Sequence, residues 1–466
     1  MLSLPGLNLT APPLDPVALA SAPAITRTQD LSPNKEFRFE VPFGRTITIK
    51  LLSGTAEYFG TEFAPNQLYS FSGTKGAVYS WHGCRLEIGG SGGDVSEYVA
   101  EETGMMGYAN AHFSLEALRE RAAHGIEGPR VLIVGPENSG KTTFTRILTS
   151  YAVKSGRQPM VVNLDPRQGM LSVPGSMSAA AFSSIIDVED GWGSSPISGP
   201  SPIPVKMPLV YHYGIGNPEL ENGKIFKPLV TRMALAVMSR LEEDRMSKQA
   251  GLLIDTPGAI SAGKGGVYDN IEHIISEFSV NIVFVMGMER LYSDLTRKYS
   301  NLPSSDTVNI IRLDSSGGCV QRDEEYMKAL RQAQIRAYFF GNNDEVALAP
   351  QSQMADFEDL HIFKIKEGQD ANALFRAYDD FGSTPDIYER VTPTPELQNS
   401  LLAVTTAAAN DRQEMIRDAS IRGYIYVADV DETKKKVRLL SPQPGQTPPN
   451  ALILGSFPED VPGLVS

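Results

Sequence analysis

The sequence has few cysteines and histidines, and this shortage excludes several classes of protein. Only 2 residues are cysteine, Cys84 and Cys319, so neither a disulfide framework nor a four-cysteine zinc site is possible. This composition favours a reducing compartment. The 6 histidines are scattered along the chain and form no HExxH-type metal-binding cluster.

Positive charge and long apolar runs are also scarce. The formal net charge of −13 argues against a protein that wraps duplex nucleic acid by bulk electrostatics, although a local basic groove remains compatible with it. No stretch approaches the roughly 20 apolar residues needed to cross a bilayer, so no membrane association is expected. The N-terminus lacks a charged region followed by an apolar core, which argues against a secretory signal.

The composition changes near residue 30. Residues 1–30 are rich in proline, alanine, leucine and threonine, which predicts a disordered leader. Beyond them, segments such as 36–41 and 46–51 alternate polar with apolar residues, and turn residues separate them. Short strands at close spacing predict an antiparallel β-sandwich or barrel, which we assign to residues 31–124. A helix over residues 115–123 is expected to lead into the next unit.

Residues 125–340 have a different period. Continuous apolar runs alternate with helical patterns, which is typical of buried parallel strands joined by helices. The expected strands lie at 131–134, 160–164, 252–254, 282–286 and 308–313, and the expected helices at 142–154, 229–245, 267–278 and 324–339. Residues 190–208 are dominated by glycine, serine and proline and are expected to form a flexible surface loop.

Residues 341–466 show a weaker period that favours strands. The expected strands lie at 362–365, 401–405, 423–428, 436–440 and 452–454. The chain as a whole is therefore predicted to be an α/β protein. Its central parallel-sheet domain is flanked by an N-terminal β-sandwich domain and a smaller, mostly β C-terminal domain.

A phosphate-binding motif begins the central domain. Residues 135–142, GPENSGKT, match GxxxxGKS/T at every fixed position, between a predicted strand and a predicted helix. Glycines let the backbone turn its amides towards phosphate oxygens, the lysine places a charge between the β- and γ-phosphates, and the threonine hydroxyl binds Mg²⁺. The motif predicts a P-loop for a nucleoside triphosphate, with ATP and Mg²⁺ as the leading interpretation. The predicted cofactor-binding residues are Gly135, Asn138, Ser139, Gly140, Lys141, Thr142 and Thr143.

A carboxylate is needed to complete the magnesium site, and two candidates follow predicted strands. Asp165 follows the run at 160–164, and Asp255 follows the run at 252–254. Both positions suit ligands in an open α/β sheet, and the residues alone do not separate them. The segment 255–258 also matches the DxxG motif of GTPases, but no NKxD motif follows it, which argues against a GTPase.

Several blocks of the sequence resemble one family, the eukaryotic polynucleotide 5′-hydroxyl kinases and their relatives in pre-mRNA cleavage and polyadenylation. The chain is most similar to the fungal cleavage factor IA branch, and the resemblance runs from about residue 36 to 454. The blocks that carry it are 57–62 (EYFGTE), 81–84 (WHGC), 128–130 (GPR), 164–169 (LDPRQG), 173–175 (VPG), 208–214 (PLVYHYG), 289–292 (ERLY) and 316–318 (SGG).

The resemblance implies roles for particular residues. It implies an N-terminal domain that lies over the nucleotide, with Glu36 and Lys75 in contact with adenosine. It also implies that Asp165 lies near Mg²⁺ with Gln168 beside it, which favours Thr142 and Asp165 as the metal ligands. If the chain is a working kinase, the resemblance assigns catalysis to Lys141, Asp165 and the lid arginines Arg322, Arg331 and Arg336.

The chain departs from active kinases of the family where RNA and the transition state would be contacted. The segment 321–336 has fewer arginines than active members and carries three acidic residues at 323–325. Gly258-Ala259 stands where active members resemble a Gly-Trp pair, so an aromatic surface for base stacking is missing. Pro166-Arg167 replaces a Val-Gly pair and stiffens the loop.

These departures favour a subunit that holds ATP but has little or no kinase turnover. The leading hypothesis is a nuclear, ATP-binding scaffold subunit of the pre-mRNA 3′-end cleavage and polyadenylation complex. The resemblance implies that its partners are other cleavage and polyadenylation subunits, above all the large scaffold subunit of cleavage factor IA that binds the RNA polymerase II C-terminal domain. Contact with RNA is expected to be indirect. The alternative is an active ATP-dependent polynucleotide 5′-hydroxyl kinase.

Overall fold

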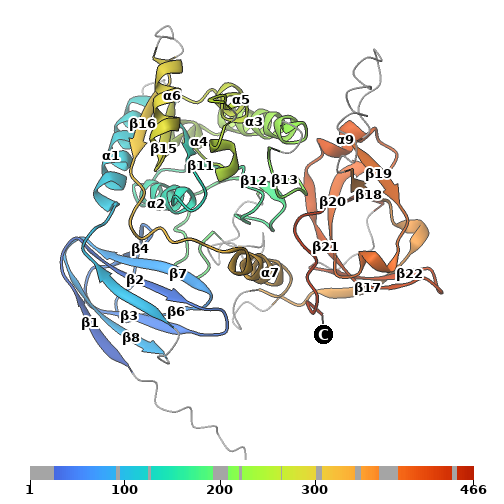
Figure 1. Ribbon diagram of the computed structural model, residues 1–466, viewed down its shortest axis with the longest axis horizontal. Helices are drawn as coiled ribbons and strands as arrows, with labels where there is room; N and C mark the ends of the chain where they lie inside the picture. The colour runs from blue at the N-terminus through green and yellow to red at the C-terminus, as the bar shows by residue number, and fades with distance from the viewer. Residues whose placement is uncertain are drawn as a thin grey trace, which may run out of the picture.

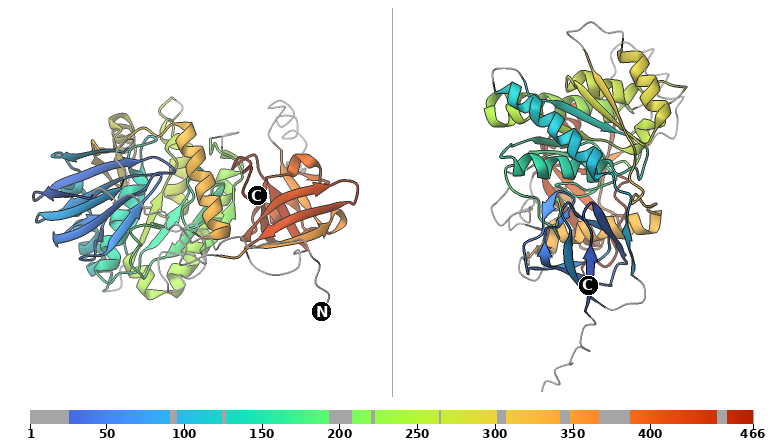
Figure 2. Two further views of the ribbon diagram at one scale, coloured as in Figure 1. Left: turned by 90° about the horizontal axis from the view of Figure 1, so that it is seen from below. Right: turned by 90° about the vertical axis from the view of Figure 1, so that its left-hand side faces the viewer.

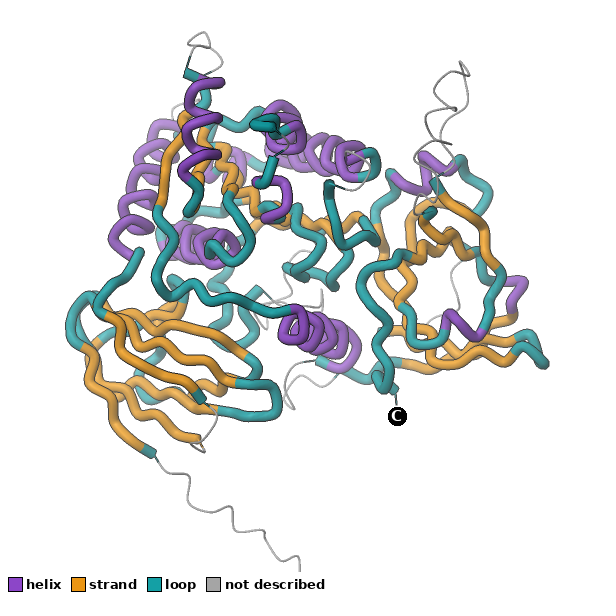
Figure 3. Tube along the Cα trace, viewed as in Figure 1, coloured by secondary structure: helices purple, strands orange, loops and turns teal. Residues whose placement is uncertain are grey.

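The computed structural model describes residues 26–90, 95–123, 127–192, 208–219, 223–263, 265–300, 307–341, 348–366, 387–442 and 449–465. Two outer units flank a central one along the long axis of the molecule (Figures 1 and 2). Strands dominate the outer units, and most helices gather in the central unit (Figure 3). The predicted fold class is therefore confirmed. In the described part of the chain, no helix is long and apolar enough to cross a membrane.

The N-terminal unit is a β-sandwich. One antiparallel sheet has the order β1-β8-β3-β6 and the other β5-β4-β7-β2-β9. Alternate side chains along β3 are buried between the sheets, since successive residues of a strand point to opposite faces. Its strands are β1 (Arg27–Leu31), β2 (Lys35–Val41), β3 (Ile47–Gly54), β4 (Glu57–Tyr58), β5 (Thr61–Glu62), β6 (Leu68–Phe71), β7 (Thr74–Ser80), β8 (Cys84–Gly90) and β9 (Ser96–Ala100).

The first strand begins earlier than the sequence pattern indicated. β1 occupies part of the range 1–30 that was expected to be a leader, because it pairs with β8 at the edge of the sandwich. Residues 1–25 lie outside the described residues, as does most of the loop expected at 190–208.

The central unit is a sheet of order β13-β12-β11-β14-β10-β15-β16 with helices around it. The five strands from β11 to β16 in this order are parallel, as predicted. Its strands are β10 (Arg130–Val134), β11 (Met160–Asn163), β12 (Ser176–Ala181), β13 (Leu209–His212), β14 (Leu252–Asp255), β15 (Ile282–Met286) and β16 (Asn309–Leu313). Its helices are α1 (Met105–Ala122), α2 (Lys141–Lys154), α3 (Phe226–Glu243), α4 (Arg245–Ala250), α5 (Asp269–Glu277), α6 (Glu289–Tyr299) and α7 (Glu324–Phe340).

Two strands that the sequence pattern did not indicate lie at one edge of this sheet. β12 and β13 extend the sheet with antiparallel pairing. The connection from β11 to β12, residues 164–175, forms no helix that could return the chain for a parallel crossover. The sequence of β12, SMSAAA, lacks the branched residues that mark a strand, so the pattern gave no signal there.

The C-terminal unit is a single seven-stranded sheet of order β17-β22-β21-β20-β23-β18-β19. Helix α7 joins it to the central unit, because Tyr338 and Phe339 pack in one core with Tyr424 and Tyr426 of β21. The backbone N–H of Tyr424 donates to the Tyr338 hydroxyl at 3.0 Å. The elements are β17 (Gln351–Asp356), β18 (Ile362–Ile365), β19 (Tyr388–Val391), β20 (Leu401–Ala408), α9 (Gln413–Arg417), β21 (Ile421–Asp431), β22 (Lys436–Ser441) and β23 (Asn450–Leu454).

Candidate nucleotide site

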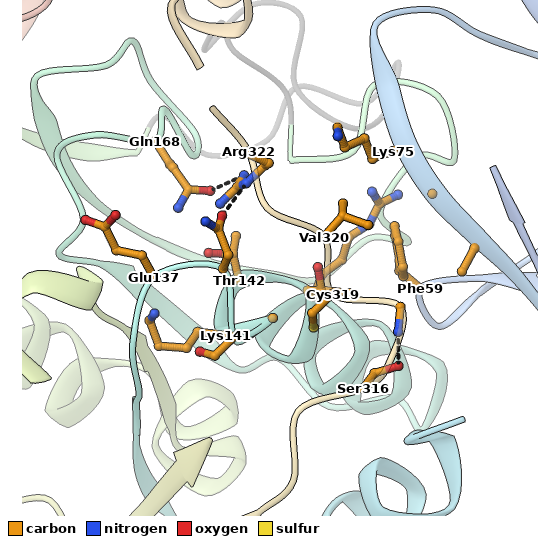
Figure 4. A pocket seen from close by; sticks show the side chains of 18 of the residues that line it. Phe59, Lys75, Glu137, Lys141, Thr142, Gln168, Ser316, Cys319, Val320 and Arg322 are labelled. Atoms are coloured by element: carbon orange, nitrogen blue, oxygen red, sulfur yellow. Dashed lines mark hydrogen bonds between the residues drawn. The ribbon is translucent and has the colours of Figure 1, made fainter. Parts of the chain in front are cut away.

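A pocket of about 400 Å³ lies between the N-terminal sandwich and the carboxyl ends of the central parallel strands. Ligands of open α/β sheets bind at this edge. The P-loop forms one wall, β2 and β7 of the sandwich form another, and the segment that leads into α7 closes a third side. Figure 4 places Lys141, Thr142 and Gln168 on the opposite side of the pocket from Lys75.

The P-loop connects β10 to α2 through two glycines with positive φ. Gly135 has φ 154° and Gly140 has φ 88°. A Cβ added at Gly135 would lie 2.5 Å from the Met286 carbonyl oxygen, so only glycine fits there. Gly135 shapes the loop without lining the pocket. The other predicted P-loop residues, Asn138, Ser139, Gly140, Lys141, Thr142 and Thr143, all line it.

Lys141 is buried at the bottom of the pocket. Its ammonium donates to the Pro136 carbonyl at 2.7 Å. Burial lowers its pKa, while the charges of Asp255 and Asp165 act in the opposite direction. The lysine therefore lies near two carboxylates. A lysine for the phosphates and carboxylates for Mg²⁺ are the groups that a P-loop site uses.

Both candidate carboxylates lie at this end of the pocket. Asp165 lines the pocket and accepts hydrogen bonds from the Arg167 backbone N–H at 3.0 Å and from Gln168 Nε2 at 3.2 Å. Asp255 lies behind Thr142, whose Oγ1 donates to Asp255 Oδ2 at 2.6 Å. Burial raises the pKa of both, that of Asp255 to about 6. The resemblance favoured Asp165 over Asp255, yet it is Asp255 that contacts the predicted metal ligand Thr142.

The donors at this end suit a magnesium ion. They are a hydroxyl and carboxylate oxygens, which Mg²⁺ prefers. Asp255 Oδ1 is buried and has no hydrogen-bond partner among the described residues, so one oxygen remains available. The described residues contain no group of three or more His, Cys, Asp or Glu side chains that could hold a metal alone. This composition fits a cation that takes its other ligands from water and phosphate.

The sandwich contributes Glu36 and Lys75 to the opposite wall. Glu36 accepts hydrogen bonds from Arg38 Nε at 2.8 Å and from the Thr103 hydroxyl. Lys75 donates to Glu40 at 2.8 Å, and its ammonium lies 5.2 Å from the centre of the Tyr326 ring. Both residues predicted to contact adenosine therefore line the pocket, and hydrogen bonds to neighbouring side chains fix the direction of each.

The three predicted lid arginines are not brought together. Arg322 lines the pocket, where its guanidinium donates to Asn138 Oδ1 at 3.0 Å and to Gln168 Oε1 at 3.2 Å (Figure 4). Arg331 and Arg336 do not line the pocket in the part of the chain that the structure describes. Arg331 is 1% exposed and pairs with Glu324 and Glu459, and Arg336 stacks on Phe340.

The physical reason is the geometry of the segment. Arg322 lies in the loop just before α7 and reaches Asn138 of the P-loop. Arg331 and Arg336 lie inside the helix. Arg331 contacts Glu459 near the C-terminus, and Arg336 lies over the ring of Phe340, one turn further along the helix.

Arg167 and Glu137 are pocket residues that the sequence reasoning did not select. Arg167 Nη1 donates to Glu137 Oε1 at 2.9 Å, and Nη2 donates to Glu324 Oε2 at 3.0 Å. Arg167 was treated only as part of a stiffened loop. Its position two residues beyond Asp165, at the carboxyl edge of β11, was the signal that would have identified it.

Three family models match the chain. The mRNA cleavage and polyadenylation factor CLP1 P-loop model matches residues 135–341, the N-terminal beta-sandwich domain of polyadenylation factor matches 30–122, and the pre-mRNA cleavage complex II protein Clp1 model matches 348–459. The mRNA cleavage and polyadenylation factor CLP1 of Phaeosphaeria nodorum is 67% identical over 100% of both chains. The homologous factor of Botryotinia fuckeliana is 50% identical over 98% of both.

Two solved structures have the same architecture. A wild-type Clp1p–Pcf11p complex is similar with a TM-score of 0.82 and 29% identity, over 93% of this chain and 98% of the solved one. A second structure, which concerns an extended Pcf11p–Clp1p interface and ATP loss in a glycine-to-arginine mutant, has a TM-score of 0.82 and 29% identity, over 94% and 99%.

Proposed function

This chain belongs to the CLP1 family of mRNA cleavage and polyadenylation factors, as its sequence blocks predicted, and on that premise we propose that it is an ATP-binding scaffold subunit of the cleavage and polyadenylation complex. In this role it holds ATP with Mg²⁺ and transfers the terminal phosphate little or not at all. The observation that carries the proposal is the contrast within one pocket. The P-loop with Lys141 and Thr142 lines one side, whereas Gly258 and Ala259, on the side that we assign to an RNA acceptor, carry no aromatic ring.

The nucleotide side supports ATP and Mg²⁺ binding. Backbone amides of the P-loop and the Lys141 ammonium would hold the phosphates. Thr142, with Asp255 behind it and Asp165 beside it, would hold the cation, which supplies charge neutralisation when bound. We assign adenosine to the wall that carries Glu36 and Lys75.

The acceptor side supports low turnover. Gly258 and Ala259 line the pocket and offer no aromatic ring on which an RNA base could stack. Of the three candidate lid arginines only Arg322 reaches the pocket, and it is already bonded to Asn138 and Gln168. A second pocket guanidinium, that of Arg167, is likewise engaged, since it is bonded to Glu137 and Glu324.

The position of the pocket gives the nucleotide a structural role. Because it lies between the sandwich and the central unit, a bound ATP would contact both and favour their docked arrangement. A ligand that binds only the native state stabilises it by mass action. We propose that the chain divides into segments 31–124, 125–340 and 341–466, with α1 of the first segment packed on the central sheet, and that the nucleotide joins the first two.

The similar solved structures are complexes of Clp1p with Pcf11p. We propose that this chain likewise binds the corresponding large scaffold protein, which the family resemblance links to the RNA polymerase II C-terminal domain. This assignment puts the protein in the nucleus, with RNA contacts made mainly through its partners.

A second candidate function is an active polynucleotide 5′-hydroxyl kinase. The observation that favours it is Arg322, whose guanidinium lies in the pocket between the P-loop and Gln168. An arginine in that place could stabilise charge on a transferring phosphoryl group.

One preparation separates the two functions. The protein is purified without added nucleotide and denatured, and released ligand is identified by chromatography. The same preparation is incubated with labelled ATP and a 5′-hydroxyl RNA. We expect intact ATP and no labelled RNA, and we expect the Lys141→Ala variant to carry no nucleotide. Labelled RNA that depends on Lys141 would make the chain a working kinase and overturn the scaffold proposal.

A further inference from the structure

Three charged side chains from separate segments meet on one wall of the pocket. Glu137 comes from the P-loop, Arg167 from the loop after β11, and Glu324 from the first residue of α7. The Arg167 guanidinium bonds to both carboxylates, at 2.9 Å and 3.0 Å. All three residues line the pocket. One guanidinium therefore links the P-loop, the β11 loop and the segment that closes the site.

This wall lies at the phosphate end of the pocket. The Arg167 backbone N–H donates to Asp165 Oδ1 at 3.0 Å, and Asp165 is close enough to Lys141 to influence its pKa. In a P-loop the lysine reaches the β- and γ-phosphates. The Arg167 side chain thus starts beside the groups that meet the last phosphate of a nucleotide.

The present partners of Arg167 are easily exchanged. The side chains of Glu137 and Glu324 are 55% and 67% exposed, and ion pairs with such exposed groups contribute little stability. Glu324 also has a second cation, because Arg331 Nη2 donates to its Oε1 at 2.6 Å. If Arg167 turned away, both carboxylates would stay hydrated or paired.

Without a cation, the same carboxylates would oppose a nucleotide. Two negative side chains on the wall of a phosphate pocket repel a triphosphate, and Arg167 is the residue that contacts both. A guanidinium also offers phosphate two parallel hydrogen bonds, which a lysine does not. A phosphate within reach would therefore be a better partner for Arg167 than the two exposed carboxylates that it contacts.

We propose that Arg167 is a specificity-determining residue that selects a nucleoside triphosphate over a diphosphate. Its guanidinium exchanges the carboxylates of Glu137 and Glu324 for the terminal phosphate, a group that a diphosphate does not place there. The inference rests on the proposed nucleotide-binding function and extends it to the identity of the nucleotide.

The test is a titration of the full-length protein with Mg²⁺–ATP and with Mg²⁺–ADP by calorimetry. We expect Arg167→Ala to weaken ATP binding by about tenfold or more, the loss of a charge-assisted hydrogen bond, and to change ADP binding by less than about twofold. Arg85→Ala is the matched control, because Arg85 makes a comparable exposed pair with Asp30 on the sandwich and does not line the pocket. It should bind both nucleotides as the wild type does.

A second variant keeps the test independent of any folding defect. Glu137→Gln with Glu324→Gln leaves Arg167 in place and removes its competitors, so ATP should bind more tightly while ADP changes less. Equal losses for both nucleotides in Arg167→Ala, or unchanged ATP binding, would overturn the inference while leaving nucleotide binding intact. A wild-type protein that binds neither nucleotide would overturn the proposed function as well.

Discussion

Asp255 is predicted to oppose folding and to support nucleotide binding, so the Asp255→Asn variant should change the two properties in opposite directions. The carboxylate is 1% exposed, and burial raises its pKa from 3.8 to about 6. A shift of roughly two pKa units corresponds to about 3 kcal/mol, by which the ionised form disfavours the folded state above pH 6. Asparagine has nearly the same shape and carries no charge.

Asparagine should therefore raise the free energy of unfolding of the nucleotide-free protein at pH 8. We expect a gain of about 1–3 kcal/mol, because the weaker hydrogen bond to Thr142 offsets part of the relief. The sign depends on pH. A folded-state pKa above the unfolded one stabilises the protein at low pH, and that stability is lost as pH rises through about 6. The variant should not show this decline.

The same substitution should weaken Mg²⁺-dependent ATP binding. The carboxylate accepts a hydrogen bond from the Thr142 hydroxyl, which leaves the lone pairs of that hydroxyl free to bind the cation. Removing a group that orients a metal ligand costs about 10–100-fold in affinity.

Chemical denaturation between pH 4 and pH 8 measures the first effect, and titration with Mg²⁺–ATP measures the second. Asp30→Asn, at an exposed pair on the sandwich, is the control for a change of surface charge. A variant that is less stable without nucleotide, or that binds Mg²⁺–ATP with wild-type affinity, would refute this account of Asp255.

Two further predictions concern the contacts that hold α7. Tyr326→Ala removes the hydroxyl that donates to the Gly73 carbonyl at 3.1 Å, so the sandwich should release the segment and nucleotide should dissociate faster, on the order of tenfold. Displacement of a fluorescent ATP analogue measures the rate, and an unchanged rate contradicts the prediction. Arg331→Met should lower the free energy of unfolding by about 1–2 kcal/mol, because Glu459 loses its ion-pair partner. The loss stays small because Glu459 is partly exposed and remains hydrated. Chemical denaturation measures this loss, with Lys328→Met, at an exposed position of the same helix, as the control. Equal losses of stability in the two variants would count against the prediction.

The order of the domains could be predicted because it depends on local patterns. The change from a two-residue period in the sandwich to continuous apolar runs in the central sheet is visible in any short window of sequence. The missed strand β12 is built largely from small residues, and its place in the sheet depends on its pairing with β11 and β13.

The P-loop was also determined by the sequence itself, because its eight residues are contiguous and each has a local physical requirement. Gly135 and Gly140 must adopt positive φ, and Lys141 and Thr142 follow at the start of a helix. The sequence blocks likewise sufficed for the family. These features do not depend on how the rest of the chain folds.

Only the tertiary structure decided which charged residues act together. Asp255 contacts Thr142 across 113 residues of sequence, and Arg167 reaches Glu324 across 157. Arg331, a lid candidate in the sequence, is buried against Glu459. The direction of a side chain depends on the helix turn that carries it and on the partners that folding brings within a few ångströms. The spacing of residues along the sequence gives neither the direction of a side chain nor its tertiary partners.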